Sequence, residues 1–258
     1  SLPKSVDFSG KTMKVVGIIP ARYASTRFPG KPLAMIAGKP MIQHVYEGVQ
    51  GIGALSDVVV ATDDDRIADC VRSFGGNVVM TQTTHRSGTD RCGEVVEQYM
   101  AQGKVYDVVV NIQGDEPNVE HSQIETLIKC FDNKTTKIAT LKKQISSKEE
   151  LFSPNVVKVV CGNSGDAIYF SRHAVPYLRG TESDQWLEKQ KYYKHIGVYA
   201  YTADVLRQLV KLEQTTLELS ESLEQLRWIE NGYTIKVQET MVENIAIDTP
   251  EDLLKLNK

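Results

Sequence analysis

Several features that would assign this sequence to a secreted, membrane or nucleic-acid-binding class are scarce or missing. Its four cysteines, Cys70, Cys92, Cys130 and Cys161, are widely spaced and form no C-x-x-C pair, which argues against a zinc site or a disulfide framework. No apolar run approaches the ~20 residues of a membrane span, and the N-terminus has no signal-peptide apolar core. The 30 basic and 33 acidic residues give a net charge of −3, so no overall positive field favours nucleic acid. We therefore expect a soluble, cytoplasmic protein with neither a membrane nor a nucleic acid as partner.

Two common phosphate-binding motifs are also absent. A P-loop would need glycine where Ser25 stands, and serine or threonine where Pro32 follows Lys31. The nearest match to the dinucleotide-binding fingerprint begins at residues 51–53, but it ends at Ser56 and follows a helix-like segment rather than a strand. The sequence therefore argues against both classes of nucleotide-binding protein.

Short apolar segments alternate with helical patterns along most of the chain. Strands are predicted at residues 15–19, 57–62, 78–80, 107–113, 138–143, 156–161, 167–170, 195–201 and 233–237. Helices are predicted at 41–49, from the acidic triplet 63–65 through Val71, around 95–99, at 202–212, at 220–231 and after Asp248. This alternation indicates βαβ units and a mixed, mainly parallel sheet, that is, an α/β fold with one Rossmann-like domain. The less regular second half predicts a smaller subdomain inserted within about 165–235.

A cationic loop follows the first predicted strand. Arg22, Arg27 and Lys31 lie just beyond it, separated by small residues such as Ser25 and Gly30. Arginine can grip phosphate oxygens with two prongs, and lysine acts as a point charge. The loop therefore suits a polyanion such as a triphosphate.

Acidic residues follow two other predicted elements. Asp115 comes directly after the strand at 107–113, and parallel strands present their ligand sites at one edge of the sheet, so we expect Asp115 near the cationic loop. Asp115 could instead be a turn residue, and Asp248 could be a helix cap. The acidic triplet at 63–65 could bind a metal, but we favour a helix N-terminus for it.

Three motifs resemble those of one enzyme family. They are P-A-R-Y-A-S-T-R-F-P-G-K-P-L at residues 20–33, N-I-Q-G-D-E-P at 111–117 and D-T-P-E-D-L at 248–253. Each is similar to a motif of the CMP-Kdo synthetases, which load CTP onto 3-deoxy-D-manno-octulosonate (Kdo), and the similarity spans residues 15–254. The resemblance implies a single nucleotidyltransferase domain over 1–258, magnesium as cofactor, CTP and Kdo as substrates, and a homodimer. It further implies that the subdomain binds the sugar and contacts the second protomer.

The resemblance also implies roles for individual residues. Nucleotide contacts would come from Pro20, Ala21, Arg22, Arg27, Lys31, Arg86, Ser87, Gly88, Arg91, Gln113 and Asp115. Catalysis would rest on Arg22, Lys31, Asp115 and Asp248, with both aspartates on magnesium. Sugar contacts would come from Gln113, Arg172, His195, Tyr199, Glu224 and Gln225. The sequence departs from the family pattern at Arg86, where glutamine is more frequent, and at 179–193.

The implied reaction is attack by the anomeric hydroxyl of Kdo on the α-phosphorus of CTP, with loss of pyrophosphate for lipopolysaccharide synthesis. Glu224, His195 or a metal-bound hydroxide could take the sugar's proton. Two alternatives stay open. One is a cytidylyltransferase for another ulosonic acid, such as sialic acid or 8-amino-Kdo, and the other is a non-catalytic nucleotide-sugar sensor on the same fold.

Overall fold

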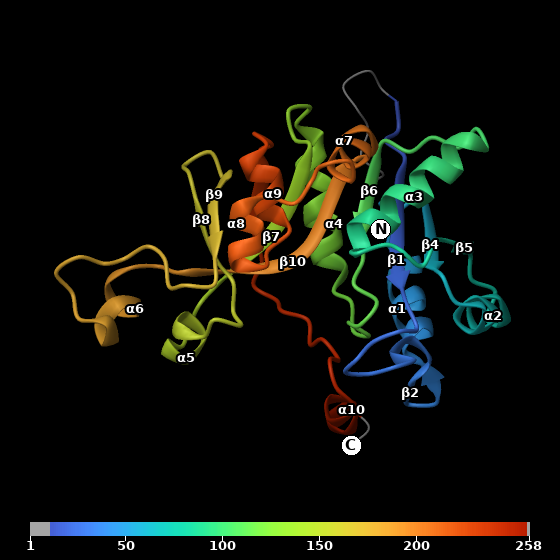
Figure 1. The fold of residues 1–258 in the computed structure, drawn as a ribbon, viewed down its shortest axis with the longest axis horizontal. Helices are drawn as coiled ribbons and strands as arrows, with labels where there is room; N and C mark the ends of the chain where they lie inside the picture. Colours follow the sequence, from blue (N-terminus) through green and yellow to red (C-terminus); the bar gives the residue numbers. More distant parts are fainter. Residues whose placement is uncertain (1–10, 257–258) are drawn as a thin grey trace.

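A nine-stranded mixed sheet forms the centre of the molecule (Figure 1). The computed structural model describes residues 11–256. The sheet runs in the order β11-β7-β10-β6-β1-β4-β5, and the β8–β9 pair joins it through β10. Its strands are β1 (Val15–Ala21), β4 (Asp57–Thr62), β5 (Val78–Met80), β6 (Val108–Asn111), β7 (Ile138–Gln144), β8 (Lys158–Cys161), β9 (Ala167–Ser171), β10 (Tyr193–Thr202) and β11 (Ile235–Glu239). Along the main path only β10 runs against its neighbours among the described strands, so the sheet is mainly parallel, as predicted.

Helices cover both faces of this sheet. On one face lie α1 (Met41–Gln50), α2 (Asp65–Ser73) and α4 (His121–Lys129); on the other lie α3 (Gly88–Ala101), α7 (Ala203–Leu209) and α9 (Gln225–Glu230). Side chains of β1 alternate between the two cores, with Val15 and Ile19 in the first and Val16 and Ile18 in the second. Because both faces are buried, the strand is apolar at nearly every position, which is why its sequence was easy to recognise.

The remaining elements are short. They are the ribbon of β2 (Met35–Ile36) and β3 (Lys39–Pro40), the helices α5 (Lys148–Phe152), α6 (Trp186–Lys189), α8 (Thr216–Glu221) and α10 (Pro250–Leu256), and the 3₁₀ turns η1 (Lys31–Leu33), η2 (Cys130–Asp132) and η3 (Ser183–Gln185). Within residues 11–256 we find no helix with the length and apolarity that a bilayer crossing requires.

All nine predicted strands are present, but two features of the prediction are wrong. The helix predicted at 220–231 is two helices, α8 and α9, because Ser222 adopts a left-handed conformation with φ of 52° and breaks the run. The first strand, predicted to end at residue 19, continues to Ala21, and Pro20 pairs in register with Ala61 of β4. The β2–β3 ribbon and α4 were not predicted.

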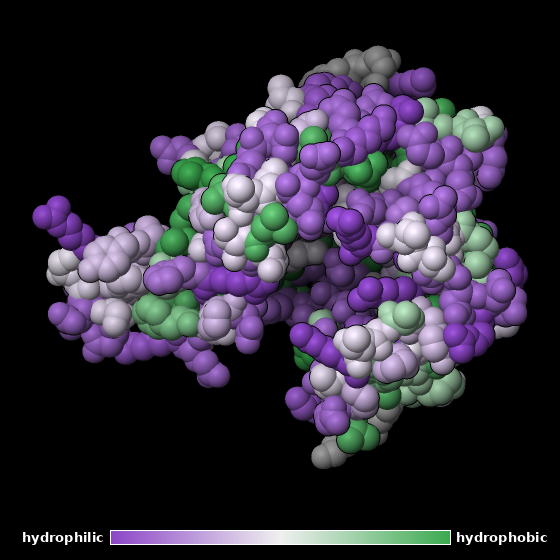
Figure 2. All heavy atoms as spheres, viewed as in Figure 1, coloured by the Kyte–Doolittle hydropathy of each residue, from purple (hydrophilic) through white to green (hydrophobic). Residues whose placement is uncertain are grey.

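A lobe stands to one side of the sheet. It contains α5 and α6 and adjoins the β8–β9 pair of the sheet, on the left of Figure 1. The lobe has a small core of its own, formed by Ile145, Leu151, Ala174, Trp186 and Tyr192. Figure 2 shows a notch in the outline between this lobe and the part of the molecule that carries α10, with hydrophilic side chains along both sides.

The loops that follow β1 and β6 leave the sheet side by side. The two strands are parallel neighbours, with Ile18 opposite Asn111. Directly beyond them, Gly114 approaches the backbone of Pro20 so closely that a Cβ on Gly114 would lie 2.8 Å from the Pro20 carbonyl oxygen. A side chain at position 114 would therefore push the two loops apart.

We expect Gly114→Ala to destabilise the protein by about 1–3 kcal/mol, because the added methyl group overpacks against backbone that cannot rotate away. Gly48→Ala is the matched control, since Gly48 lies in α1 and an added Cβ there meets nothing within 4 Å. That control should be neutral or stabilising by about 0.5–1 kcal/mol. Urea unfolding of both variants measures the difference, and equal shifts in the same direction would contradict the close contact.

Candidate active site

A cavity of about 380 Å³ lies beyond the carboxyl ends of β1 and β6. Many of the residues predicted for the site line it: Pro20, Ala21, Arg22, Lys31, Arg86, Ser87, Gly88, Arg91, Gln113, Asp115, Tyr199 and Glu224. Ser25, Pro32, His85, Thr89, Asn111, Ile112 and Gly114 complete the lining. The cationic loop and the Asp115 loop therefore share one cavity, as the parallel-sheet rule predicts.

Lys31 joins three distant segments at one end of this cavity. Its Nζ lies 3.3 Å from Oδ2 of Asp115 and donates a hydrogen bond to the carbonyl of Ile247 at 2.9 Å. The amide of Ile247 in turn donates to the carbonyl of Asp115 at 2.8 Å. Asp248 follows Ile247 directly, so the C-terminal segment brings a second carboxylate to the Asp115 loop.

Asp248 is not the cap of α10. Thr249 accepts a hydrogen bond from the amide of Asp252, and the Asp252 carboxylate accepts from the amides of Thr249 and Asp248. This reciprocal pattern is a capping box, and it leaves the exposed carboxylate of Asp248 available for another role.

The Asp115 and Asp248 carboxylates lie close enough to act on a common neighbour. Burial raises the pKa of Glu116, and the charges of Asp115, Glu243 and Asp248 raise it further, against a hydrogen bond from Asn244. Within residues 11–256 no group of three or more His, Cys, Asp or Glu side chains is arranged to hold a metal. A divalent cation here would therefore rest on one or two carboxylates and on substrate oxygens, which is the pattern that suits Mg²⁺.

Two amides hold the C-terminal segment in place. Asn244 Nδ2 donates to Glu116 Oε2 and to Gln123 Oε1, both at 3.0 Å, and Gln123 Nε2 donates to the carbonyl of Val242 at 2.7 Å. Gln123 is buried on α4. These bonds fix the path of the chain before it reaches Asp248.

The start of α3 forms the opposite wall of the cavity. Ser87 caps this helix by accepting from the amide of Asp90 at 3.2 Å. Arg91, which is buried, donates to Thr81 Oγ1 at 2.6 Å and lies 3.4 Å from Asp63 Oδ2. The free amides and positive dipole of a helix N-terminus suit an anionic ligand.

The acidic triplet divides between two roles. Asp64 caps α2 by accepting from the amide of Arg66 at 2.9 Å, so the predicted helix N-terminus is confirmed. Asp63, in contrast, pairs with Arg91 and so belongs to the support of the cavity wall rather than to the helix end.

Glu224 enters the cavity from the turn before α9. Its Oε1 accepts a hydrogen bond from Thr89 Oγ1 at 2.7 Å. Burial raises the pKa of Glu224, and hydrogen bonds from Thr89 and Ser87 oppose that shift. A partly desolvated carboxylate of this kind is suited to proton transfer.

His195 and Tyr199, two of the predicted sugar contacts, both lie on β10. The hydroxyl of Thr140 donates its one proton to the carbonyl of Val198 at 2.7 Å, so the contact of 2.9 Å between Thr140 Oγ1 and His195 Nε2 requires that the histidine donate. Burial lowers the pKa of His195 to about 3. His195 is thus neutral near pH 7, with its proton on Nε2, and its ring lies between Phe170 and Tyr199.

Arg172 is held by backbone carbonyls. Its guanidinium donates to the carbonyls of Glu221, Pro154 and Ser222, and its amide donates to the Glu221 carboxylate. Arg172 does not line the cavity, and neither do Arg27, His195, Gln225 and Asp248. Gln113 does, with its amide nitrogen 2.9 Å from the carbonyl of Gly197.

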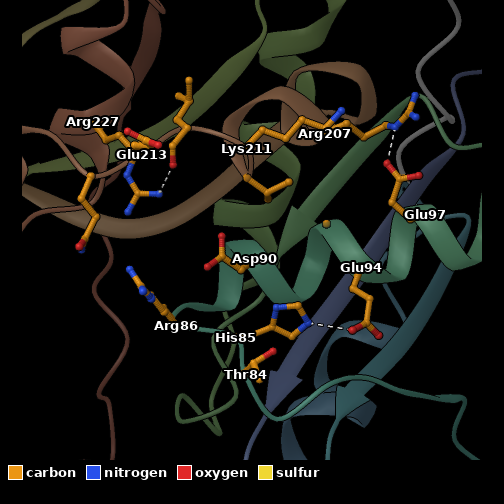
Figure 3. Close-up of a pocket in the computed structure, with 14 residues that line it drawn as sticks. Thr84, His85, Arg86, Asp90, Glu94, Glu97, Arg207, Lys211, Glu213 and Arg227 are labelled. Carbon is orange, nitrogen blue, oxygen red and sulfur yellow. Dashed lines mark hydrogen bonds and ion pairs between the residues drawn. The ribbon is translucent and has the colours of Figure 1, made fainter.

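A second cavity, of about 800 Å³, adjoins the first and shares His85 and Arg86 with it. Figure 3 shows its charged lining from α3, α7 and the segment after α7. Two hydrogen-bonded pairs form between residues of its lining: Arg207 with Glu97 at 2.6 Å and His85 with Glu94 at 2.9 Å. Arg86 therefore stands at the boundary of the two cavities.

Sequence reasoning missed the hydrogen bonds that join polar residues in the wall of the cavity. Asn111 and Tyr201 lie on β6 and β10, and Thr89 bonds both Tyr201 and Glu224. Asn111 carried one signal, since it is a polar residue within an apolar strand pattern. Nothing in the sequence paired Thr89 with Glu224, which lies 135 residues away.

A nucleotide-sized cavity at the carboxyl edge of a mainly parallel sheet, with cations from one loop and carboxylates from two others, defines a nucleotidyltransferase-like site. Comparison with known proteins agrees. The model of the family described as Cytidylyltransferase matches residues 16–242. The chain belongs to this cytidylyltransferase family.

Individual relatives are similar over nearly their whole length. A 3-deoxy-manno-octulosonate cytidylyltransferase of Parabacteroides distasonis is 57% identical, covering 94% of this chain and 96% of that protein. The protein of the same name from Phocaeicola vulgatus is 56% identical with the same coverage. Among solved structures, a CMP:2-keto-3-deoxy-manno-octonic acid synthetase complexed with CTP has a TM-score of 0.87 and 43% identity, covering 95% of this chain and 97% of that one.

The buried carboxylate of Glu224 should make stability depend on pH. Because the pKa of Glu224 is raised in the folded state, the unfolded carboxyl ionises at lower pH, and rising pH increasingly favours the unfolded chain. We expect Glu224→Gln to raise Tm relative to the unmodified protein, by more at pH 8 than at pH 4.5. Thermal melts at the two pH values test this, and an equal difference at both would show that the carboxylate carries no such cost.

Proposed function

We propose that this protein transfers CMP from CTP to 3-deoxy-D-manno-octulosonate, releasing pyrophosphate, as part of lipopolysaccharide synthesis. The observation that carries the proposal is the Lys31–Asp115–Ile247 junction at the rim of the cavity, because it gathers cation and carboxylate where a triphosphate would lie. The named relatives and the CTP-bound neighbour support the choice of both substrates.

In this reaction the anomeric hydroxyl of the sugar attacks the α-phosphorus of CTP. A new P–O bond forms, the bond to pyrophosphate breaks, and the hydroxyl's proton leaves to a base. Phosphoryl transfer asks a protein chiefly for positioning and charge stabilisation. Arg22, Arg27 and Lys31 would oppose the charge on the phosphates, while the first turn of α3 would hold the cytidine with Ser87 and Gly88.

We propose that Asp115 and Asp248 hold magnesium. The ion would neutralise phosphate charge and favour departure of pyrophosphate. Support comes from the backbone hydrogen bond between Ile247 and Asp115, which brings the residue before Asp248 to the Asp115 loop, and from the capping of α10 by Thr249 and not by Asp248. Carboxylate oxygens are among the ligands that Mg²⁺ prefers.

Glu224 is our candidate for the base. It lines the cavity as a partly desolvated carboxylate, whereas His195 is a hydrogen-bond donor through Nε2 and holds a depressed pKa. His195, Tyr199, Gln113 and Gln225 would then contact the sugar's hydroxyls, with Arg172 near its carboxylate after release from its backbone partners.

We further propose that the segment within about 165–235 binds the sugar and contacts a second protomer, and that the protein acts as a cytoplasmic homodimer. The exposed apolar side chains of Ile168 and Leu219 support an interface there. The free thiols of all four cysteines are consistent with a reducing compartment.

Removing a phosphate-facing cation should lower turnover. We expect Arg22→Ala and Lys31→Ala to reduce kcat by about 10²–10³-fold, because each removes one preorganised charge. Lys39→Ala is the matched control, since Lys39 is exposed and pairs with Glu47 on α1, away from the cavity. Pyrophosphate release measures all three, and retention of near-normal rates in both cavity variants would contradict the proposal.

Asp115→Asn and Asp248→Asn should each abolish most activity and raise the magnesium concentration needed for what remains, because each loses one negative oxygen ligand. Asp69→Asn, an exposed carboxylate on α2, serves as control. Titration of turnover with Mg²⁺ distinguishes the variants.

Assays with the four nucleotides and a panel of Kdo, 8-amino-Kdo and sialic acid test the substrate. Turnover of sialic acid alone would overturn Kdo as the substrate. Nucleotide binding without any turnover would favour a sensor.

A further inference from the structure

A chain of hydrogen bonds runs along the wall of the cavity and ends on Glu224. Asn111 Nδ2 lies 3.4 Å from the hydroxyl of Tyr201, that hydroxyl lies 3.0 Å from Thr89 Oγ1, and Thr89 Oγ1 lies 2.7 Å from Glu224 Oε1. Asn111, Thr89 and Tyr201 are all buried. The chain connects β6, β10, the first turn of α3 and the turn before α9.

The proton count gives this chain a direction. An amide nitrogen only donates, so Asn111 donates to the oxygen of Tyr201, and the single proton of each hydroxyl must point onward, from Tyr201 to Thr89 and from Thr89 to Glu224. A proton on Glu224 Oε1 would reverse the last two bonds. Tyr201 would then accept twice, and its own proton would lose its partner in the chain.

We propose that Thr89 is a positioning residue that holds Glu224 as an oriented carboxylate at the sugar end of the cavity, an inference that rests on the proposed function. Thr89 belongs to the first turn of α3, next to Ser87 and Gly88 on the nucleotide side. One turn of helix therefore links the part of the cavity assigned to cytidine with the carboxylate assigned to the sugar.

Other groups that face Glu224 do not replace this bond. Asp90 and Cys92 of α3 and Tyr199 and Tyr201 of β10 supply no positive charge. Arg227 of α9 is attractive but forms its ion pair with the Glu218 carboxylate. The Ser87 hydroxyl also donates to Glu224. The hydrogen bond from Thr89, however, lowers the pKa of Glu224 more than the one from Ser87 does.

The test compares Thr89→Val with Thr89→Ser. Valine keeps the shape but removes the hydroxyl, so the acidic limb of the pH profile of kcat/KM for Kdo should move up by about one pH unit, and kcat/KM should fall about tenfold. Serine restores the donor and should restore both. Thr136→Val controls for the substitution itself, because Thr136 is buried and its hydroxyl has no hydrogen-bond partner in the described chain.

An unmoved acidic limb in Thr89→Val, or serine behaving like valine, would overturn the inference. If Thr89→Val does not fold, Tyr201→Phe should move the limb in the same direction by less, and no movement there would have the same consequence. Failure of the unmodified protein to release pyrophosphate with any acid sugar would instead overturn the proposed function, and this inference with it.

Discussion

The contact between Lys31 and Asp115 depends on the order of the central strands. Because β1 and β6 are parallel neighbours, the loops that leave their carboxyl ends meet, and opposite charges separated by 84 residues come within 3.3 Å. Lys31 also donates a hydrogen bond to the carbonyl of Ile247, which holds the C-terminal segment against the Lys31–Asp115 pair. Cation, carboxylate and C-terminal segment therefore share one anchor, and the geometry of the site follows from it.

The titratable groups of the site differ in how deeply they are buried, and this affects their pKa values. Arg22 is exposed where it lines the cavity. Deeper groups have shifted pKa values: burial raises that of Glu224 and lowers that of His195, so each favours its neutral form more than it would in water. Only Glu224 is surrounded by hydroxyl donors that favour its charged form, which makes it the better proton acceptor of the two.

The sequence predicted the fold well because its strands carry strong local signals. The apolar run in β1 and the cationic loop after it could be identified from the local sequence alone. The rule that parallel strands present ligand sites at one edge then predicted Asp115 beside them. Other features depend on contacts between distant residues. The break at Ser222 is a single left-handed residue within a helical pattern, and the bond from Thr89 to Glu224 spans 135 residues. The local periodicity of the sequence predicts neither the helix break nor this hydrogen bond, because tertiary packing determines both.

The lobe and the C-terminal segment are mechanically connected through Lys194. Its buried ammonium forms ion pairs with Glu150 on α5 and with Glu243, five residues before Asp248. Removing Glu150 or Glu243 would leave the buried charge of Lys194 with fewer partners. Separating the two segments would therefore cost free energy. Because Lys194 directly precedes His195 on β10, a displacement of the lobe would move both His195 and the segment that leads to Asp248. One buried cation, in addition to the sheet, therefore connects β10, which carries the proposed sugar residue His195, with the segment that carries the proposed metal ligand Asp248.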